Sequence, residues 1–417
     1  MRPPSAEVLH PAASASLAQA VRPGGALLYL PAASSSRLAA RSLVGRTLTV
    51  RSLVAAVRVG ASIIAIPVGL RDAAVERALA RMPALKAATI HWLEPGSPEP
   101  PGPPGQPWLL VPVSSLVEAR TLHGLVEPPA PPQGVVLTAS ADSPAPVAVL
   151  PLAAVGVLWS RLAAGSPAGP DLARLLREVG AQPRKSTGLF VAVSDEGDLA
   201  RAEDALFGGL GIEADTGVDR YFHRRCSLWI TRFLVRTPVT ANHVSIASLA
   251  IGSVAIWCFW RASPLSALWG VIFYAIATIL DHADGEIARL TLQESRSGAN
   301  LDWTIDTIIH SGLALGMAVT AGGQLMQLVG LFSALGVTLS ALFARHLPLE
   351  IAVGSNAGGV LKGLGNRDFV YMLLLSFVAF RWLVPSLLHP LAVVVAVGSQ
   401  AYWIACLARI LHLRLTR

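Results

Sequence analysis

The chain has 417 residues, of which 53% are hydrophobic and only 14% are charged, whereas an average soluble domain has roughly 25% charged residues. The formal net charge is +7, and the mean hydropathy is +0.54. Three cysteines are too few for a disulfide framework, and the apolar content excludes a disordered chain. We attribute the basic excess to a membrane surface and expect no nucleic acid partner.

The first 23 residues mix alanine, serine and proline without a continuous apolar segment, so we expect a disordered N-terminus and no secretory signal. Over residues 24–208, short apolar runs alternate with stretches that suit helices, a pattern typical of βαβ units and a parallel sheet. The expected strands are residues 26–30, 61–66, 108–113, 134–137, 148–150 and 188–193, with a linker at 95–107 and a helix at 198–207. The pattern predicts a cytosolic α/β domain.

A segment rich in arginine and aromatic residues follows, and we assign residues 209–240 to an interfacial amphipathic helix. Between residues 219 and 236, arginines alternate with tyrosine, phenylalanine, leucine and tryptophan. The arginines are Arg220, Arg224, Arg225, Arg232 and Arg236. A helix of this composition is typical of the boundary between lipid headgroups and acyl chains. The alternative is an ordinary surface helix.

Residues 241–417 contain six apolar runs long enough to span a membrane, which predicts an all-α membrane domain of six helices. The runs lie at about residues 243–260, 264–288, 300–321, 325–345, 368–387 and 390–411. A further apolar run at 146–159 is interrupted by Pro151 and is shorter than the roughly 18 residues that a span needs. We therefore keep it in the α/β domain.

Basic residues alternate between the loops in the way that the positive-inside rule requires. Those expected inside are Arg289, Arg296, Arg345, Lys362, Arg367, Arg409, Arg414 and Arg417, and those expected outside are Arg261 and Arg381. This distribution predicts an integral, multi-pass membrane protein with both termini in the cytoplasm.

Four aspartates lie in the second and third spans, where charge is costly. They are Asp281, Asp284, Asp302 and Asp306. An ionised aspartate at the centre of a span costs roughly 2.5–3.5 kcal/mol, so four would cost on the order of 10–14 kcal/mol without compensation. The first pair is three residues apart and the second pair four apart, so each pair shares a helix face. Hard oxygen ligands favour Mg²⁺ or Mn²⁺, with room for one or two ions, and a two-metal site typically serves phosphoryl transfer.

Small residues and one arginine accompany these aspartates. Gly285 and Gly298 allow a ligand to approach closely, and Arg289 can bind phosphate in a fork. Residues 281–306 read D-x2-D-G-x2-A-R-x8-G-x3-D-x3-D without a departure. The eight positions are Asp281, Asp284, Gly285, Ala288, Arg289, Gly298, Asp302 and Asp306. This pattern resembles the signature of the CDP-alcohol phosphotransferase family, membrane enzymes with six transmembrane helices.

The resemblance implies a role for each motif residue. The first three aspartates would bind divalent metal, as two Mg²⁺ or Mn²⁺ ions, and Asp306 would be the catalytic general base and could also touch metal. Gly285, Ala288, Arg289 and Gly298 would line the nucleotide site. A CDP-alcohol donor would transfer its substituted phosphate to an acceptor hydroxyl with release of CMP. The resemblance also implies a homodimer.

Three residues outside the motif are further candidates. Asn242 lies in Thr240-Ala-Asn-His-Val-Ser245, which is similar to the family's T-P-N-x-V-T sequence before its first span, and would contact the nucleotide. The alternative is that Asn242 caps the helix. Lys362 and Arg367 lie where relatives with phosphorylated acceptors carry basic residues, so they would receive an acceptor phosphate. Their alternative role is positive-inside anchoring.

The α/β domain is similar in layout to sugar-nucleotide and inositol-phosphate cytidylyltransferases, which have a Rossmann-like fold. Residues 30–37 read L-P-A-A-S-S-S-R where such enzymes have a glycine-rich loop, and residues 108–115 lack the expected metal-binding aspartate. A loop that cradles phosphate with backbone N–H groups needs glycine for close approach. We therefore expect a nucleotidyltransferase-like domain without catalysis, the alternative being a divergent active enzyme.

The fusion of these two domains resembles bifunctional enzymes that make CDP-inositol and join it to inositol phosphate. We therefore expect an inositol-phosphate type of CDP-alcohol phosphotransferase in a bacterial or archaeal cell membrane, in contact with membrane lipid. One alternative is a phospholipid synthase that uses CDP-diacylglycerol, of the phosphatidylinositol phosphate or phosphatidylglycerol phosphate type. Another is a non-catalytic membrane scaffold whose α/β domain recruits a partner.

Overall fold

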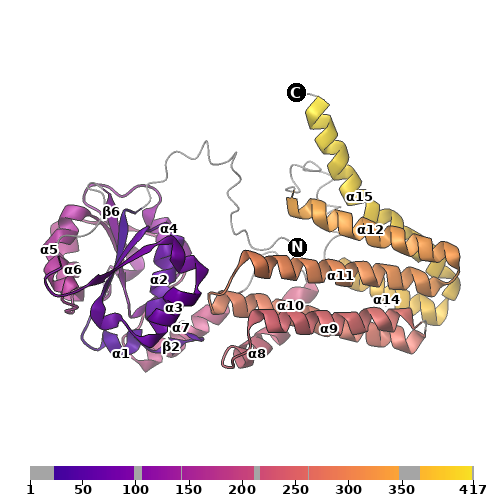
Figure 1. Cartoon of the computed structure of the whole chain (residues 1–417), viewed down its shortest axis with the longest axis horizontal. Helices are drawn as coiled ribbons and strands as arrows, with labels where there is room; N and C mark the ends of the chain where they lie inside the picture. The colour runs from indigo at the N-terminus through magenta and orange to yellow at the C-terminus, as the bar shows by residue number, and fades with distance from the viewer. Residues whose placement is uncertain are drawn as a thin grey trace. The chain divides into compact units, whose positions relative to one another are not determined.

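The structure, a computed structural model, describes residues 23–97, 106–141, 143–210, 217–261, 263–346 and 367–415. The chain divides into two compact units near residue 210, and residues 290–292 are grouped with the N-terminal unit. Figure 1 shows the helices and strands of both units.

The N-terminal unit is built on a seven-stranded sheet with the order β10-β8-β9-β6-β1-β4-β5. Its strands are β1 (Gly25–Tyr29), β4 (Ile63–Pro67), β5 (Thr89–Leu93), β6 (Pro107–Pro112), β8 (Val135–Leu137), β9 (Ala148–Pro151) and β10 (Gln182–Arg184). Strand β9 runs antiparallel to both of its neighbours, while the other pairs are parallel. The expected α/β domain with a mostly parallel sheet is confirmed.

In the described part of this unit, seven α-helices accompany the sheet. They are α1 (Ser35–Ala39), α2 (Leu48–Arg58), α3 (Ala73–Arg81), α4 (Ala119–Val126), α5 (Leu152–Ala163), α6 (Gly169–Glu178) and α7 (Glu196–Gly208). Side chains begin three of them by accepting backbone hydrogen bonds: Thr47 for α2, Asp72 for α3 and Asp195 for α7. The apolar run at 146–159 becomes β9 and α5, as expected of a segment too short to span a membrane.

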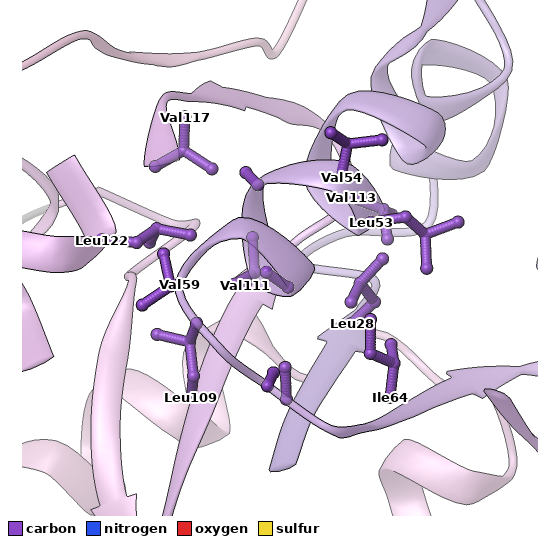
Figure 2. Close-up of a cluster of buried hydrophobic side chains, with 14 of the residues drawn as sticks. Leu28, Leu53, Val54, Val59, Ile64, Leu109, Val111, Val113, Val117 and Leu122 are labelled. Carbon is purple, nitrogen blue, oxygen red and sulfur yellow. The ribbon is translucent and has the colours of Figure 1, made fainter. Parts of the chain in front are cut away.

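Two cores lie on opposite faces of the sheet, because successive side chains of a strand point to opposite sides. On β1, Leu28 belongs to the core with α2, α3 and α4, while Leu27 and Tyr29 belong to the core with α5 and α6. Figure 2 shows the first core, where Leu53 of α2 and Leu109 of β6 are fully buried. The unit is therefore a three-layer α/β/α sandwich.

Three details of the sheet differ from the sequence expectation, the first being β5, an edge strand that was not expected. Residues 188–193 contain β11 (Phe190–Ala192), but this strand pairs with β7 (Ser115–Val117) in a separate antiparallel ribbon. The main sheet instead ends at β10, which carries glutamine, proline and arginine and therefore lacks an apolar signal. A second ribbon joins β2 (Ser42–Leu43) to β3 (Arg46–Thr47).

The described part of the C-terminal unit is helical. It comprises a π-helical turn η4 (Asp219–His223), α8 (Arg224–Leu234), α9 (Ala241–Trp260), α10 (Pro264–Leu290), α11 (Arg296–Ala321), α12 (Gln324–His346), α14 (Arg367–Leu383), the short η5 (Pro385–Leu387) and α15 (Leu388–Leu415). Helix α11 packs against α9 and α12, and α12 packs against α15.

Five of these helices are long and apolar enough to cross a membrane: α9, α10, α11, α12 and the stretch from Pro385 to His412. Helix α14 covers the fifth expected span but has 17 residues and is not among the five. It ends at Leu383 rather than near residue 387, because Pro385 follows and cannot continue the helix ladder. The predicted membrane protein is thus supported, while the count of six spans is not confirmed.

Glycines allow α9 and α11 to approach closely. A Cβ on Gly252 would lie 2.4 Å from Ile309 Cδ1, and a Cβ on Gly312 would lie 2.4 Å from Ile256 Cδ1. Contacts this short do not occur for real Cβ atoms, so a larger residue at either position would force the facing isoleucine to move. Small residues at such crossings are typical of helix packing in membranes. They keep α11, and with it Asp302, against the rest of the bundle.

Candidate active site

Three of the four predicted ligand residues converge between two helices. Asp281 and Asp284 of α10 and Asp302 of α11 each offer a carboxylate oxygen, and these oxygens lie within 4.8 Å of one another. Asp284 is buried, and the other two are half-buried. Carboxylates this close repel one another unless a cation lies between them. Their hard oxygen donors therefore fit a divalent cation such as Mg²⁺.

The fourth aspartate occupies a separate place. Asp306 lies one helical turn beyond Asp302 on α11, is outside the group of three, and has a side chain that is 33% exposed. Its carboxylate lies 3.9 Å from Nη2 of Arg367. The arrangement suits a group beside the metal ligands, and metal binding by Asp306 itself stays a prediction.

A serine on the neighbouring helix orients one ligand. Ser245 of α9 is buried and donates a hydrogen bond to Oδ2 of Asp284 at 2.5 Å. Metal ligands are commonly held by such outer partners, which fix the carboxylate orientation. Ser245 stands where the similar T-P-N-x-V-T sequence ends in threonine, and no role was predicted for it. Its position one turn after the start of α9 was the available signal.

The residues predicted to bind the nucleotide form two close pairs, Gly285 with Arg289 and Gly298 with Asn242. A Cβ on Gly285 would lie 3.4 Å from Nη1 of Arg289, so the glycine lies beside the guanidinium. Nε of Arg289 is buried and has no hydrogen-bond partner among the described residues, which leaves a donor for an anion. A Cβ on Gly298 would lie 4.0 Å from Oδ1 of Asn242, which places α9 and α11 together there. Ala288 is half-buried on α10.

The alternative that Asn242 caps a helix is wrong. The cap of α9 is Thr240, whose hydroxyl accepts a hydrogen bond from the His243 N–H while the His243 ring accepts one from the Thr240 N–H. This reciprocal pair already satisfies the helix start. Asn242 is exposed and free to contact a ligand.

Arg367 begins the described part of α14 and lies deep among the acids. It is 7% exposed, pairs with Asp281, and places Nη1 2.6 Å from Nε2 of His282. The same guanidinium approaches Asp219 at 3.7 Å and Asp306 at 3.9 Å. An anchoring arginine needs exposure to headgroups, so the anchoring alternative does not fit this burial. Lys362 lies outside the described residues.

A buried polar group that was not predicted from the sequence surrounds this arginine. Its members are Asp219, His223, His282 and Tyr371. Burial by itself would raise the pKa of Asp219, but the hydrogen bond with His223 and the charge of Arg367 outweigh it and hold that pKa well below its usual range. The spacing of four between Asp219 and His223 was the only local signal, and the arginines and aromatics around it obscured it.

A second polar group fixes α8 to α10. Glu286 is fully buried and pairs with Arg224 at 2.8 Å. The hydroxyls of Ser227 and Thr231 donate to the same carboxylate, each at 2.7 Å. Arg224 is thus buried in the protein and does not face headgroups, contrary to the expectation for the arginines of this segment. The opposite side of α8 leaves aromatic rings exposed, with Trp229 at 76%.

His310 of α11 is one turn beyond Asp306 and makes a hydrogen bond with the hydroxyl of Tyr274, 3.0 Å away. Such a bond satisfies a histidine in the bundle.

Residues 238–407 match the model of the CDP-alcohol phosphatidyltransferase family. The chain therefore carries a CDP-alcohol phosphatidyltransferase domain in its C-terminal part, which confirms the resemblance drawn from the aspartate motif. The matched stretch contains most described residues of the candidate site. The five that precede it are Asp219, His223, Arg224, Ser227 and Thr231.

Three curated relatives are each named bifunctional IPC transferase and DIPP synthase. The one from Rubrobacter xylanophilus is 35% identical over 152 residues, 36% of this chain and 33% of the relative. The one from Thermococcus kodakarensis is 31% identical over 123 residues, 29% of this chain and 27% of the relative. The one from Archaeoglobus fulgidus is 26% identical over 209 residues, 47% of this chain and 40% of the relative. The matches thus span 27% to 40% of the relatives' length.

Proposed function

We propose that the protein is a membrane CDP-alcohol phosphotransferase. The observation that carries the proposal is the convergence of Asp281, Asp284 and Asp302 within 4.8 Å, with Asp306 one turn further along α11. An acceptor hydroxyl attacks the phosphorus bonded to the alcohol moiety of the donor. A new oxygen–phosphorus bond forms, the pyrophosphate bond breaks, and CMP leaves.

The aspartates divide into two roles. Asp281, Asp284 and Asp302 would hold Mg²⁺ or Mn²⁺, as one or two ions, which would supply positive charge against the charge that develops on the transferred phosphate. Ser245 keeps the Asp284 carboxylate oriented. Asp306 takes the proton of the acceptor hydroxyl, which its partial exposure allows because a substrate can reach it.

The remaining motif residues bind the donor. Gly285 and Gly298 leave room beside α10 and α11 for the pyrophosphate and cytidine, and Ala288 adds only a small side chain. Nε of Arg289, which has no hydrogen-bond partner among the residues that the structure describes, supplies a donor toward phosphate. Asn242 binds the nucleotide from α9, supported by its place beside Gly298.

The acceptor site is proposed on the other side of the aspartates. Arg367, with Lys362 near it in the sequence, receives a phosphorylated acceptor of the inositol-phosphate type. The burial of Arg367 between Asp281 and Asp306 supports this role, because a phosphate bound there lies next to the general base. The names of the three relatives support the substrate class.

Further proposals concern the rest of the chain. We propose that both termini are cytoplasmic, that the protein acts in a bacterial or archaeal cell membrane in contact with lipid, and that it forms a homodimer. The N-terminal unit lacks nucleotidyltransferase activity in this proposal. The metal-binding aspartate expected after β6 is absent, since residues 113–115 are valine and two serines. The hydroxyl of Ser115 donates to the Pro112 carbonyl at 2.9 Å.

One observation favours a second candidate, a phospholipid synthase with CDP-diacylglycerol as donor. An apolar groove of about 440 Å³ lies between α8 and α10. Its lining residues are Arg225, Cys226, Trp229, Ile230, Ile276 and Ile279. A groove lined by isoleucine and tryptophan suits an acyl chain.

The experiment measures CMP release by the full chain in lipid vesicles, with CDP-inositol or CDP-diacylglycerol as donor, inositol phosphate or glycerol phosphate as acceptor, and Mg²⁺ present or absent. We expect Mg²⁺-dependent CMP release that Asp306→Asn reduces by at least about a hundredfold, within the usual range for a general base. The control is Glu178→Gln, an exposed acid at the end of α6 that lies outside the site. Absence of CMP with every donor, or full activity of Asp306→Asn, would leave the scaffold reading in place.

A further inference from the structure

Arg367 is the meeting point of acids from three separate segments. Its guanidinium faces Asp219 of η4 at 3.7 Å, Asp281 of α10, and Asp306 of α11 at 3.9 Å. A flexible arginine side chain loses rotamer entropy when its orientation is fixed, so a fixed orientation needs partners that hold it. Asp281 is committed to metal in the proposed function, and Asp306 to the acceptor proton. Asp219 has neither duty.

Asp219 is itself held by an aromatic hydrogen-bonded chain. Nδ1 of His223 lies 2.9 Å from Oδ1 of Asp219, and the hydroxyl of Tyr371 lies 2.9 Å from Nε2 of the same ring. The two rings stack with centroids 5.2 Å apart. The tautomer that satisfies both contacts has Tyr371 donating to Nε2 and Nδ1–H donating to Asp219. The carboxylate of Asp219 is therefore held by a partner other than Arg367.

His282 contacts both Arg367 and Asp219. Arginine has only donors, so where Nη1 of Arg367 meets Nε2 of His282 at 2.6 Å the ring nitrogen accepts. That nitrogen lies 3.1 Å from Oδ1 of Asp219 and cannot also donate to it in this tautomer. Asp219, His223 and His282 also have the spacing of a metal group. The guanidinium already occupies the histidine lone pair, so arginine is the better-fitting cation.

The backbone joins the same two segments independently. The carboxylate of Asp368 accepts hydrogen bonds from the N–H groups of Gly217 and Val218, both at 3.1 Å. Adjacent residues thus form two links between η4 and α14: Asp368 to the residues before Asp219, and Asp219 to Arg367. This double link places the carboxylate against the guanidinium.

We propose that Asp219 is a positioning residue, which fixes Arg367 beside Asp281 and Asp306 so that the guanidinium meets the acceptor phosphate in a set orientation. The inference rests on the proposed function for the part that concerns the acceptor. It extends the site to η4, which lies before the stretch that matches the family model.

The test is a double-mutant cycle in the full chain in lipid vesicles, with Asp219→Asn, Arg367→Lys and the two combined. CMP release is measured at saturating donor while the acceptor concentration varies. We expect Asp219→Asn to raise KM for the acceptor about tenfold, to leave KM for the donor within about twofold, and to add less than about twofold once residue 367 is lysine. Asp219→Glu, which keeps the charge, should recover part of the loss.

The control is Glu286→Gln, which removes an equally buried carboxylate that pairs with Arg224 instead. Its effect should be additive with that of Arg367→Lys, because the contacts described for Glu286 and for Arg367 involve different residues. Additive effects of Asp219→Asn and Arg367→Lys would overturn the inference. The same cycle is also read on the thermal unfolding midpoint. If the unaltered chain releases no CMP, the proposed function fails, and coupling of the midpoints still decides whether Asp219 holds Arg367.

Discussion

Replacement of Ser245 by alanine isolates the partner of one proposed metal ligand. The hydroxyl donates to Oδ2 of Asp284 at 2.5 Å, and the serine is 5% exposed. A hydrogen bond to a charged group contributes about 1.5–3 kcal/mol. Loss of an outer partner of a metal ligand typically lowers metal affinity by about 10- to 100-fold. The two estimates agree, since about 1.4 kcal/mol corresponds to a factor of ten.

The assay titrates Mg²⁺ against CMP release at saturating donor and acceptor. We expect Ser245→Ala to raise the half-saturating Mg²⁺ concentration about tenfold or more, because the Asp284 carboxylate is no longer held in its binding orientation. Ser245→Thr keeps the hydroxyl and should stay close to the unaltered protein.

The matched control lies one turn further along α9. Ser248 is 1% exposed and donates to the carbonyl of Ala277 at 2.9 Å, so Ser248→Ala removes a buried hydrogen bond without touching a ligand. It should lower the unfolding midpoint and leave the Mg²⁺ titration unchanged. An unchanged titration for Ser245→Ala, or an equal shift for Ser248→Ala, would refute the reasoning.

Three other predictions concern stability. Glu286→Gln leaves Arg224 without its buried counter-charge and should lower the free energy of unfolding by about 3–5 kcal/mol, measured by unfolding in detergent; a change below about 1 kcal/mol would contradict the burial argument. Gly312→Ala should cost about 1–3 kcal/mol by overpacking, whereas Gly398→Ala, where nothing lies within 4 Å of the new Cβ, should be close to neutral in the same measurement. The hydrogen bond from the Ser194 N–H lowers the pKa of Asp198, so its stabilising effect is present above the unfolded value of about 3.9 and is lost as pH falls below it. Hydrogen-exchange protection of α7 should therefore fall on acidification in the unaltered chain and change less in Asp198→Asn.

The strands that the sequence revealed are those with strong apolar runs. Strand β1 (Gly25–Tyr29) and strand β6 (Pro107–Pro112) are buried on both faces, and their sequences are nearly uninterrupted apolar runs. The reversed direction of β9 and the edge position of β10 depend on pairing between distant segments, which composition does not encode. The same reason explains why β11 was placed in the wrong sheet.

The candidate site divides in the same way. The paired aspartates were found because helical spacing of three and four puts them on one face, and α10 and α11 are consecutive helices. Asp219 and His223 lie about sixty residues before Asp281, on a segment whose contacts only tertiary packing creates. Arg367 was found by position in the chain, but its pairing with Asp281 could not be derived without the packing of α14.

The polar side of α8 is buried in the protein and its aromatic side is exposed, which affects where this chain can be divided into fragments. Its hydrophilic side is bonded to Glu286, and its outward side carries rings such as Trp229 and Phe233. A fragment that ends at residue 240 would keep those rings while losing the glutamate that satisfies Arg224, and we expect it to aggregate or require detergent. A fragment that ends at residue 210 retains both cores of the seven-stranded sheet and lacks α8 with its exposed rings, so we expect it to be soluble without detergent. Solubility of the two fragments therefore reports which face of α8 the protein has turned outward.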